Sequence, residues 1–170
     1  GRTQRSNRVS KSWILSLAPR CDGLIATIIG TPGNDNIIGT PGDDVIVGLA
    51  GEDNIDGKGG NDVICGNEDH DQLEGGDGND RIFGGDGPDR IWGQDGDDFI
   101  FGGDGDDVVY GGNGRDSIDG GAGNDRLKGD NDDDRIFGGA GDDTLDGEAG
   151  NDFLQDIALV GNNRFYGGDG

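Results

Sequence analysis

The sequence is short of the residues that build an ordinary globular core. It has no methionine, one histidine, two cysteines and four prolines among 170 residues, and only 29% of it is hydrophobic. No run of about 18 apolar residues occurs, which argues against a transmembrane helix. Acidic residues number 36 against 13 basic ones, so the formal charge of −23 disfavours nucleic acid as a partner. If its residues were randomly ordered, such a chain would stay disordered.

The motifs of common secreted enzymes are also missing. There is no H-E-x-x-H motif of a metalloprotease and no G-x-S-x-G motif of a lipase. The single histidine, His70, lies in a loop-like stretch, where a solvent-facing residue is favoured over a metal ligand. The acidic run 130–135 lacks the sixth-place glycine of an EF-hand loop. We therefore expect that this chain is not an enzyme.

What the chain has in abundance is glycine, with 39 residues, placed at a strict period of nine. From residue 30 to residue 155, fourteen consecutive nine-residue units align without a gap, and each opens with glycine. The eighth place is always aliphatic, and the fourth place is glycine in all units except those carrying Asp69 and Asp132. The sixth place is always aspartate: Asp35, Asp44, Asp53, Asp62, Asp71, Asp80, Asp89, Asp98, Asp107, Asp116, Asp125, Asp134, Asp143 and Asp152. Such regularity argues against disorder.

Each place in the unit has a physical reason. Places seven to nine predict a three-residue strand whose middle, aliphatic side chain points inward. Places one to six predict a turn, in which glycines accept positive φ and let backbone carbonyls face a ligand. A short aspartate arm keeps its carboxylate close to those carbonyls. Carboxylate and carbonyl oxygens together are what Ca²⁺ prefers, with six to eight ligands.

This pattern resembles the repeats-in-toxin (RTX, hemolysin-type) nonapeptide GGxGxDxUx, in which U is aliphatic. The resemblance implies an all-β, right-handed parallel β-roll, a β-solenoid with two nonapeptides per turn and about seven turns. It also implies that Ca²⁺ binds between successive turns, with the fourteen sixth-place aspartates as ligands. Six gaps on each side of the roll give about twelve ions, which roughly balance the formal charge of −23. We expect a chain that is largely unfolded without calcium and a rigid rod with it.

The repeat divides the chain into four parts. Residues 1–20 are basic and are interpreted as an N-terminal tail or cap, and residues 21–29 as a metal-free first strand with Ile28 pointing inward. Residues 30–155 form the calcium-binding roll. Residues 156–170 contain further repeats that are shifted in register and cut short, with Asn163 in an aspartate position. The loops with Asp69 and Asp132 are expected to be bent rather than broken, because aspartate tolerates left-handed geometry, but their calcium sites are in doubt.

Alternate units must lie on opposite sheets, which we name sheet one, starting at residues 36–38, and sheet two, starting at residues 45–47. Outward places are apolar in 9 of 14 cases on sheet two and in 4 of 14 on sheet one. Sheet two is therefore predicted to be covered, partly by the N-terminal segment with Trp13, Ile14 and Leu15 and partly by another protein. The alternative is that strands favour such residues on either face. The predicted partner face consists of Val45, Val47, Val63, Phe83, Phe99, Phe101, Phe137 and Phe153.

The two cysteines fall near this same face. Cys65 lies at an outward ninth place of sheet two, and Cys21 begins a unit of the same parity two turns earlier. At about 4.8 Å per turn, a disulfide forms if the first segment folds over the sheet; two buried free thiols are the alternative. A disulfide would indicate an oxidising, extracellular compartment.

The sequence is compatible with three functions. The first is an extracellular calcium-binding structural module, a rod or subunit of a cell-surface, adhesive or secreted assembly, for which the resemblance also allows calcium-triggered folding during type I secretion. The second is the non-catalytic C-terminal roll of a secreted hydrolase, such as a protease, lipase or lyase. The third is ice binding, which is disfavoured because Thr31 and Thr40 lie in loops and neither sheet has a threonine column.

Overall fold

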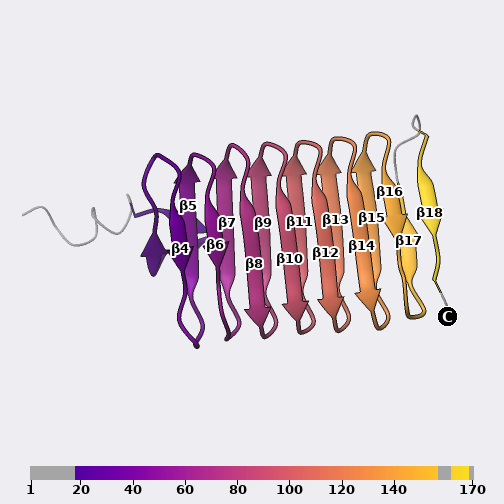
Figure 1. The fold of residues 1–170 in the computed structure, drawn as a ribbon, viewed down its shortest axis with the longest axis horizontal. Coiled ribbons are helices and arrows are strands. Elements are labelled where there is room, and N and C mark those ends of the chain that lie inside the picture. The colour runs from indigo at the N-terminus through magenta and orange to yellow at the C-terminus, as the bar shows by residue number, and fades with distance from the viewer. Residues whose placement is uncertain (1–17, 157–161, 169–170) are drawn as a thin grey trace, which may run out of the picture.

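The computed structural model describes residues 18–156 and 162–168 and forms a parallel β-solenoid of about seven turns. Each turn of 18 residues contributes one strand to each of two eight-stranded sheets, as in the register that pairs Ile82 with Ile100 and Ile100 with Ile118. The strands stack side by side along the long axis of the molecule (Figure 1). The predicted fold class is therefore confirmed. Within the described ranges, no helix is long and apolar enough to cross a membrane.

The two sheets follow the parity predicted from the repeat. Sheet one contains β4 (Asn36–Ile38), β6 (Asn54–Asp56), β8 (Gln72–Asp77), β10 (Arg90–Asp95), β12 (Val108–Asn113), β14 (Arg126–Asn131), β16 (Thr144–Asp146) and β18 (Arg164–Tyr166). Sheet two contains β3 (Ile28–Ile29), β5 (Val45–Ala50), β7 (Val63–Glu68), β9 (Arg81–Asp86), β11 (Phe99–Asp104), β13 (Ser117–Ala122), β15 (Arg135–Ala140) and β17 (Phe153–Gln155).

The core is a single thin layer between the sheets. It contains the eighth-place side chain of every unit from Ile37 to Leu145, and all of these except Ile37 are fully buried. Ile28 and Leu154 are partly buried against its two ends, so Ile28 does point inward as predicted. Because each turn adds only two side chains to this layer, each turn packs only on its neighbours.

The central strands are longer than the repeat predicted. Three-residue strands were expected, whereas β9 and its neighbours have six residues and continue through the first three places of the next unit. Gly85, at the second place with a φ of 125°, still pairs with Gly103 one turn later. Backbones that are 18 residues apart have the same conformation, so they form hydrogen bonds with each other even where the chain begins to turn. The turn between strands is therefore shorter than the six residues that the repeat predicted.

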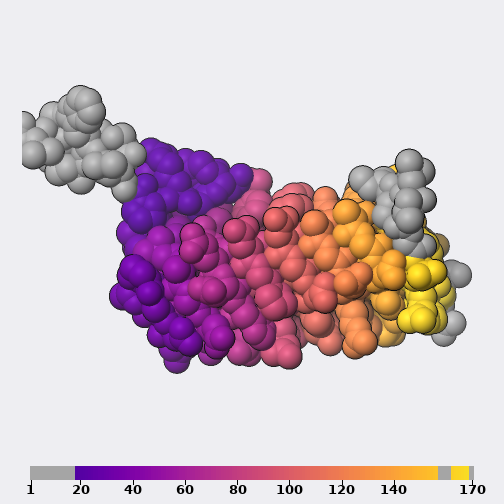
Figure 2. Space-filling view, turned by 90° about the horizontal axis from the view of Figure 1, so that it is seen from above, coloured from indigo at the N-terminus to yellow at the C-terminus, as the bar shows by residue number. Residues whose placement is uncertain are grey.

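Residues 20–29 do not form one strand. They divide into an antiparallel hairpin, β1 (Arg20–Cys21) and β2 (Leu24–Ile25), and the short strand β3, which alone joins sheet two. The cause is a tight turn at Asp22 and Gly23, which both have positive φ. The hairpin lies over the N-terminal end of sheet two and stands out from the roll in Figure 2.

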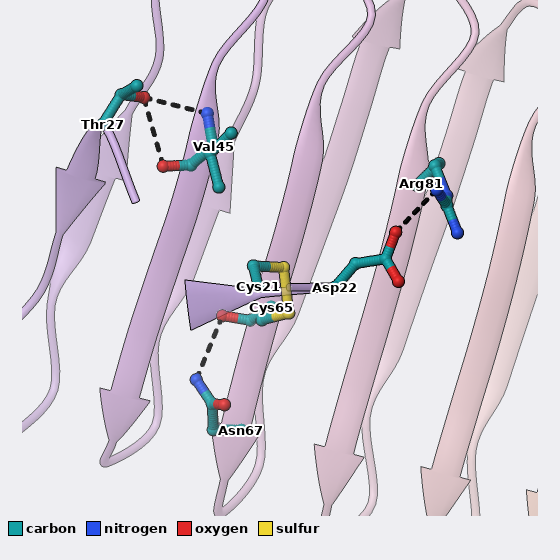
Figure 3. Close-up of a disulfide and its surroundings, with 7 residues drawn as sticks. All are labelled: Cys21, Asp22, Thr27, Val45, Cys65, Asn67 and Arg81. Carbon is teal, nitrogen blue, oxygen red and sulfur yellow. Dashed lines mark hydrogen bonds and ion pairs between the residues drawn. A yellow bond between two sulfur atoms is a disulfide. The ribbon is translucent and has the colours of Figure 1, made fainter. Parts of the chain in front are cut away.

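The hairpin is fixed to the sheet by the predicted disulfide. Cys21 and Cys65 are bonded, with their Cα atoms 5.7 Å apart. Figure 3 shows the bond crossing from the hairpin to β7, and beside it Asp22 forms an ion pair of 2.6 Å with Arg81 on β9. The sulfurs pack in a small apolar cluster with Val47 and Val63. The alternative of two free thiols is thereby excluded.

The predicted partner face is consequently divided. Its first part packs in the cluster beside the chain's own hairpin, with Val47 and Val63 buried and Val45 and Phe83 half-buried. Its second part remains accessible, with Phe99, Phe101 and Phe153 exposed by 40%, 36% and 51%. Phe137 is half-buried and packs against Phe153 at 6.0 Å between ring centroids. Residues Trp13, Ile14 and Leu15 lie outside the described residues.

The first prediction concerns the disulfide. Replacing both cysteines (C21A/C65A) should lower the free energy of unfolding of the calcium-loaded chain by about 2–4 kcal/mol, because the bond closes a long loop. Denaturant titration in excess calcium measures this. D22N, which removes only the partly exposed ion pair with Arg81, should change the free energy by less than about 1 kcal/mol. Equal stability of C21A/C65A and the unmodified chain would contradict the prediction.

Candidate metal centre

The sixth-place aspartates form one ladder along each edge of the roll, where a turn leads into a strand. Each lies one residue before a strand, and the ladder step is one turn of 18 residues. Those from Asp44 to Asp143 are buried, whereas Asp35 and Asp152, at the two ends, are half-buried. The repeat therefore places these carboxylates inside the protein.

One oxygen of each carboxylate is used by the fold. The backbone N–H of Asp80 donates to Asp98 Oδ1 at 2.8 Å, and the N–H of Asp98 donates to Asp116 Oδ1 at 2.9 Å. The same bond is repeated along both ladders, and Asn163 accepts the N–H of Asp143 at 2.8 Å. Asn163 therefore takes an aspartate position 20 residues after Asp143 instead of 18, which agrees with the shift in register predicted for residues 156–170.

The other oxygen is buried and has no partner. Eleven consecutive sixth-place aspartates, from Asp53 to Asp143, have an Oδ2 atom that is buried and accepts no hydrogen bond. In these units Oδ2 lies against the first-place glycine; a Cβ on Gly84, for example, would overlap Asp89 Oδ2 and the carbonyl oxygen of Gly102. A buried carboxylate oxygen without a donor or a cation is strongly unfavourable, so the arrangement fits a cation.

The electrostatics of the ladder agree with this. Burial, with a smaller contribution from the carboxylate one turn away, raises the pKa of Asp80 and Asp98 to about 7 and that of Asp116 to about 8. Backbone N–H donation to Oδ1 lowers these pKa values but does not offset the burial. Without a cation, the folded ladder thus favours protonated over charged aspartate.

Side chains alone do not complete a metal site. Among residues 18–156 and 162–168, no three His, Cys, Asp or Glu side chains lie close enough together to hold an ion. Backbone oxygens must therefore supply the remaining ligands. They point toward the adjacent turn: a Cβ on Gly96 would overlap the Gly78 carbonyl oxygen, and one on Gly114 would overlap that of Gly96. A donor set of carboxylate and carbonyl oxygens suits Ca²⁺ and lacks the nitrogen and sulfur that zinc prefers.

The two loops in which aspartate replaces the fourth-place glycine keep the common geometry. Asp69 and Asp132 adopt φ values of 81° and 75°, in the left-handed region used by glycine at the same place in other units. The loops are therefore bent rather than broken, as predicted. Their ladder residues, Asp71 and Asp134, have the same partnerless Oδ2 as their neighbours.

A second, exposed ladder was missed by the sequence analysis. At the fifth place, the backbone N–H of Asp97 donates to Asn79 Oδ1 at 3.0 Å, and that of Arg115 donates to Asp97 Oδ1 at 2.9 Å. Most units have Asn or Asp at this place. This preference could have predicted the second ladder, since both side chains carry an oxygen that can accept a backbone N–H of the next turn.

Comparison with known proteins agrees with this geometry. The RTX calcium-binding nonapeptide repeat (4 copies) matches residues 29–64, 66–100, 83–118, 92–127 and 119–154. None of the curated proteins compared with the chain matches it. The matched residues include all eleven sixth-place aspartates that have a buried, partnerless oxygen. Because the match covers well over half of the sequence, the chain belongs to the family of RTX calcium-binding nonapeptide repeat proteins.

Proposed function

We propose that this chain is a non-catalytic calcium-binding module that folds when calcium binds and serves as a rigid rod or subunit in a secreted or cell-surface assembly. The observation that carries the proposal is the row of eleven buried, partnerless Oδ2 atoms from Asp53 to Asp143. Calcium, when bound, supplies the positive charge and the six to eight oxygen contacts that these carboxylates and the loop carbonyls can share between adjacent turns.

In the folded roll, the protein's own residues shape this site. Hydrogen bonds to Oδ1 hold each carboxylate in a fixed orientation, with Oδ2 left for the ion. First-place glycines leave room for Oδ2, and positive φ at the second and fourth places turns the loop backbone. The acidic charge of −23 then concentrates divalent cations near the chain.

Two observations support an extracellular role in an assembly. The Cys21–Cys65 disulfide is typical of an oxidising compartment. Phe99, Phe101 and Phe153 are exposed on sheet two, which supports contact with another protein. That the chain is not itself an enzyme rests on its sequence, which has neither a zinc-protease nor a lipase motif.

The second prediction tests calcium-dependent folding. In excess chelator, the chain should lose most of its far-UV circular dichroism signal for β-structure, because the ladder carboxylates repel one another and are poorly solvated. Added calcium should restore it, and equal magnesium should restore it less, because Mg²⁺ demands near-ideal octahedral geometry and retains its water. A β signal that is unchanged by chelator would contradict the proposed function.

The third prediction compares two variants, one at a proposed calcium ligand and one at the neighbouring exposed aspartate. D98N replaces a buried ladder carboxylate and should remove about one or two bound ions, measured by mass spectrometry of the native chain. D97N is the control, since Asp97 is exposed and its oxygen accepts the Arg115 N–H, which asparagine can also accept. The same ion count in D98N and the unmodified chain would argue against Asp98 as a ligand.

The fourth prediction concerns pH in the absence of calcium. Because burial raises the pKa of Asp80, Asp98 and Asp116 above the ordinary value of 3.8, their protonated forms favour folding. This stabilisation is complete below the unfolded-state pKa and is lost as the pH rises through about 7 to 8. The chelated chain should therefore show more β-structure by circular dichroism at about pH 5 than at about pH 8. The reverse order would refute this account.

A further inference from the structure

The first two loops of the roll are built differently from those that follow. Both have the sequence Gly-Thr-Pro-Gly, at residues 30–33 and 39–42. They lead to Asp35 and Asp44, which precede the eleven ladder residues with partnerless oxygens. Both of these aspartates have hydrogen-bond donors for Oδ2.

The donors belong to the threonine of the same loop. Thr31 donates its backbone N–H to Asp35 Oδ2 at 2.5 Å, and its hydroxyl lies 2.9 Å from the same oxygen. Thr40 makes the equivalent contacts with Asp44 Oδ2 at 2.7 and 2.9 Å. The hydroxyl of Thr27 lies 3.3 Å from Asp44 Oδ1, so both oxygens of Asp44 are capped by threonine. In these two loops, a backbone N–H and a hydroxyl therefore occupy the side of the carboxylate that has no partner from Asp53 to Asp143.

Proline explains why these loops cannot adopt the common conformation. In the later loops the second-place residue has positive φ, including Leu49 at 92° and Lys58 at 80°. Thr31 and Thr40 precede Pro32 and Pro41, and a residue before proline is restricted to extended conformations. Neither threonine has positive φ. The N–H of each threonine therefore points into its own loop, toward Asp35 or Asp44.

Other contacts that need no metal gather at the same end. The Cys21–Cys65 disulfide and its apolar cluster fasten the hairpin to β5 and β7. The Val45 N–H donates to Thr27 Oγ1 at 2.9 Å, and Thr27 Oγ1 donates to the Val45 carbonyl at 3.1 Å (Figure 3). The Thr27 N–H donates to the same carbonyl at 2.7 Å. These contacts tie the segment before the first repeat to the second repeat.

We propose that residues 18–65 form a metal-independent cap, which stays folded without calcium and provides the surface on which calcium-bound turns assemble. This inference rests on the proposed calcium-dependent folding and refines it. It places the first ions beyond the two threonine loops and lowers the expected number from about twelve to about ten. The cap also contains the first two carboxylates with a partnerless Oδ2, Asp53 and Asp62, and orients them, since the N–H groups of Asp35 and Asp44 donate to their Oδ1 atoms at 2.9 and 2.8 Å.

Hydrogen exchange of the full, disulfide-bonded chain, followed by mass spectrometry of its peptides in excess chelator, tests the inference. Amides within residues 36–65 should exchange at least about tenfold more slowly than those of residues 72–140. The variant T31V/T40V keeps the side-chain shape but removes both hydroxyls, and should accelerate exchange at residues 36–47 by about tenfold. T144V is the matched control, because Thr144 lies at an outward place of β16, away from the cap.

Hydrogen exchange in excess calcium shows whether a variant has lost only the cap or the whole fold. In excess calcium, T31V/T40V, T144V and the unmodified chain should all be protected across the roll. The cap is refuted if chelator leaves residues 36–65 as unprotected as the rest, or if T31V/T40V exchanges like T144V. Protection of the whole roll in chelator would instead refute calcium-dependent folding itself, so the two failures are distinguishable.

Discussion

The structure depends on one constraint, which is that a carboxylate oxygen is buried without a hydrogen-bond donor in eleven consecutive nonapeptides. The fold supplies a donor for Oδ1 of each ladder aspartate but none for Oδ2 from Asp53 to Asp143. Such a group is tolerated only if it is protonated or paired with a cation. The glycine at the first place and the left-handed loop residues follow from this constraint, because they create the space and the carbonyl orientation that an ion requires.

The thin core explains why the constraint is not relieved by packing. Each nonapeptide between the two end units adds one fully buried aliphatic side chain, such as Ile82 or Ile100, and one buried aspartate. The buried apolar area and the number of buried carboxylates therefore grow together as turns are added. A longer roll does not become more stable without a cation simply because it is longer. The ratio is fixed by the repeat itself, so the balance changes in favour of folding only when the carboxylates are protonated or paired with a cation.

The period of nine predicted the fold and the ladder because both depend on residue type at a fixed place, and fourteen aligned units leave little freedom. Other features depend on conformation and were less accessible. The strands extend through Gly85 because stacked backbones pair there, which a side-chain pattern does not reveal. The disulfide could be predicted because Cys21 and Cys65 fall in units of the same sheet. The hairpin that carries Cys21 could not, because it arises from positive φ at Asp22 and Gly23. The role of Thr31 and Thr40 became visible only with their hydrogen bonds.

A cation bound between two turns introduces a problem of initiation. The ion needs ligands from both turns, so the first turn to form has no neighbour and no complete site, and its own ordering is uncompensated. Repeat proteins with only nearest-neighbour contacts share this difficulty. At one end of this roll, threonine, a disulfide and an apolar cluster replace the ion with contacts that lie within the polypeptide. A turn held in this way already presents oriented carboxylates, and each later turn then completes a site whose first half exists. Assembly would accordingly proceed from the N-terminal end toward the C-terminal end.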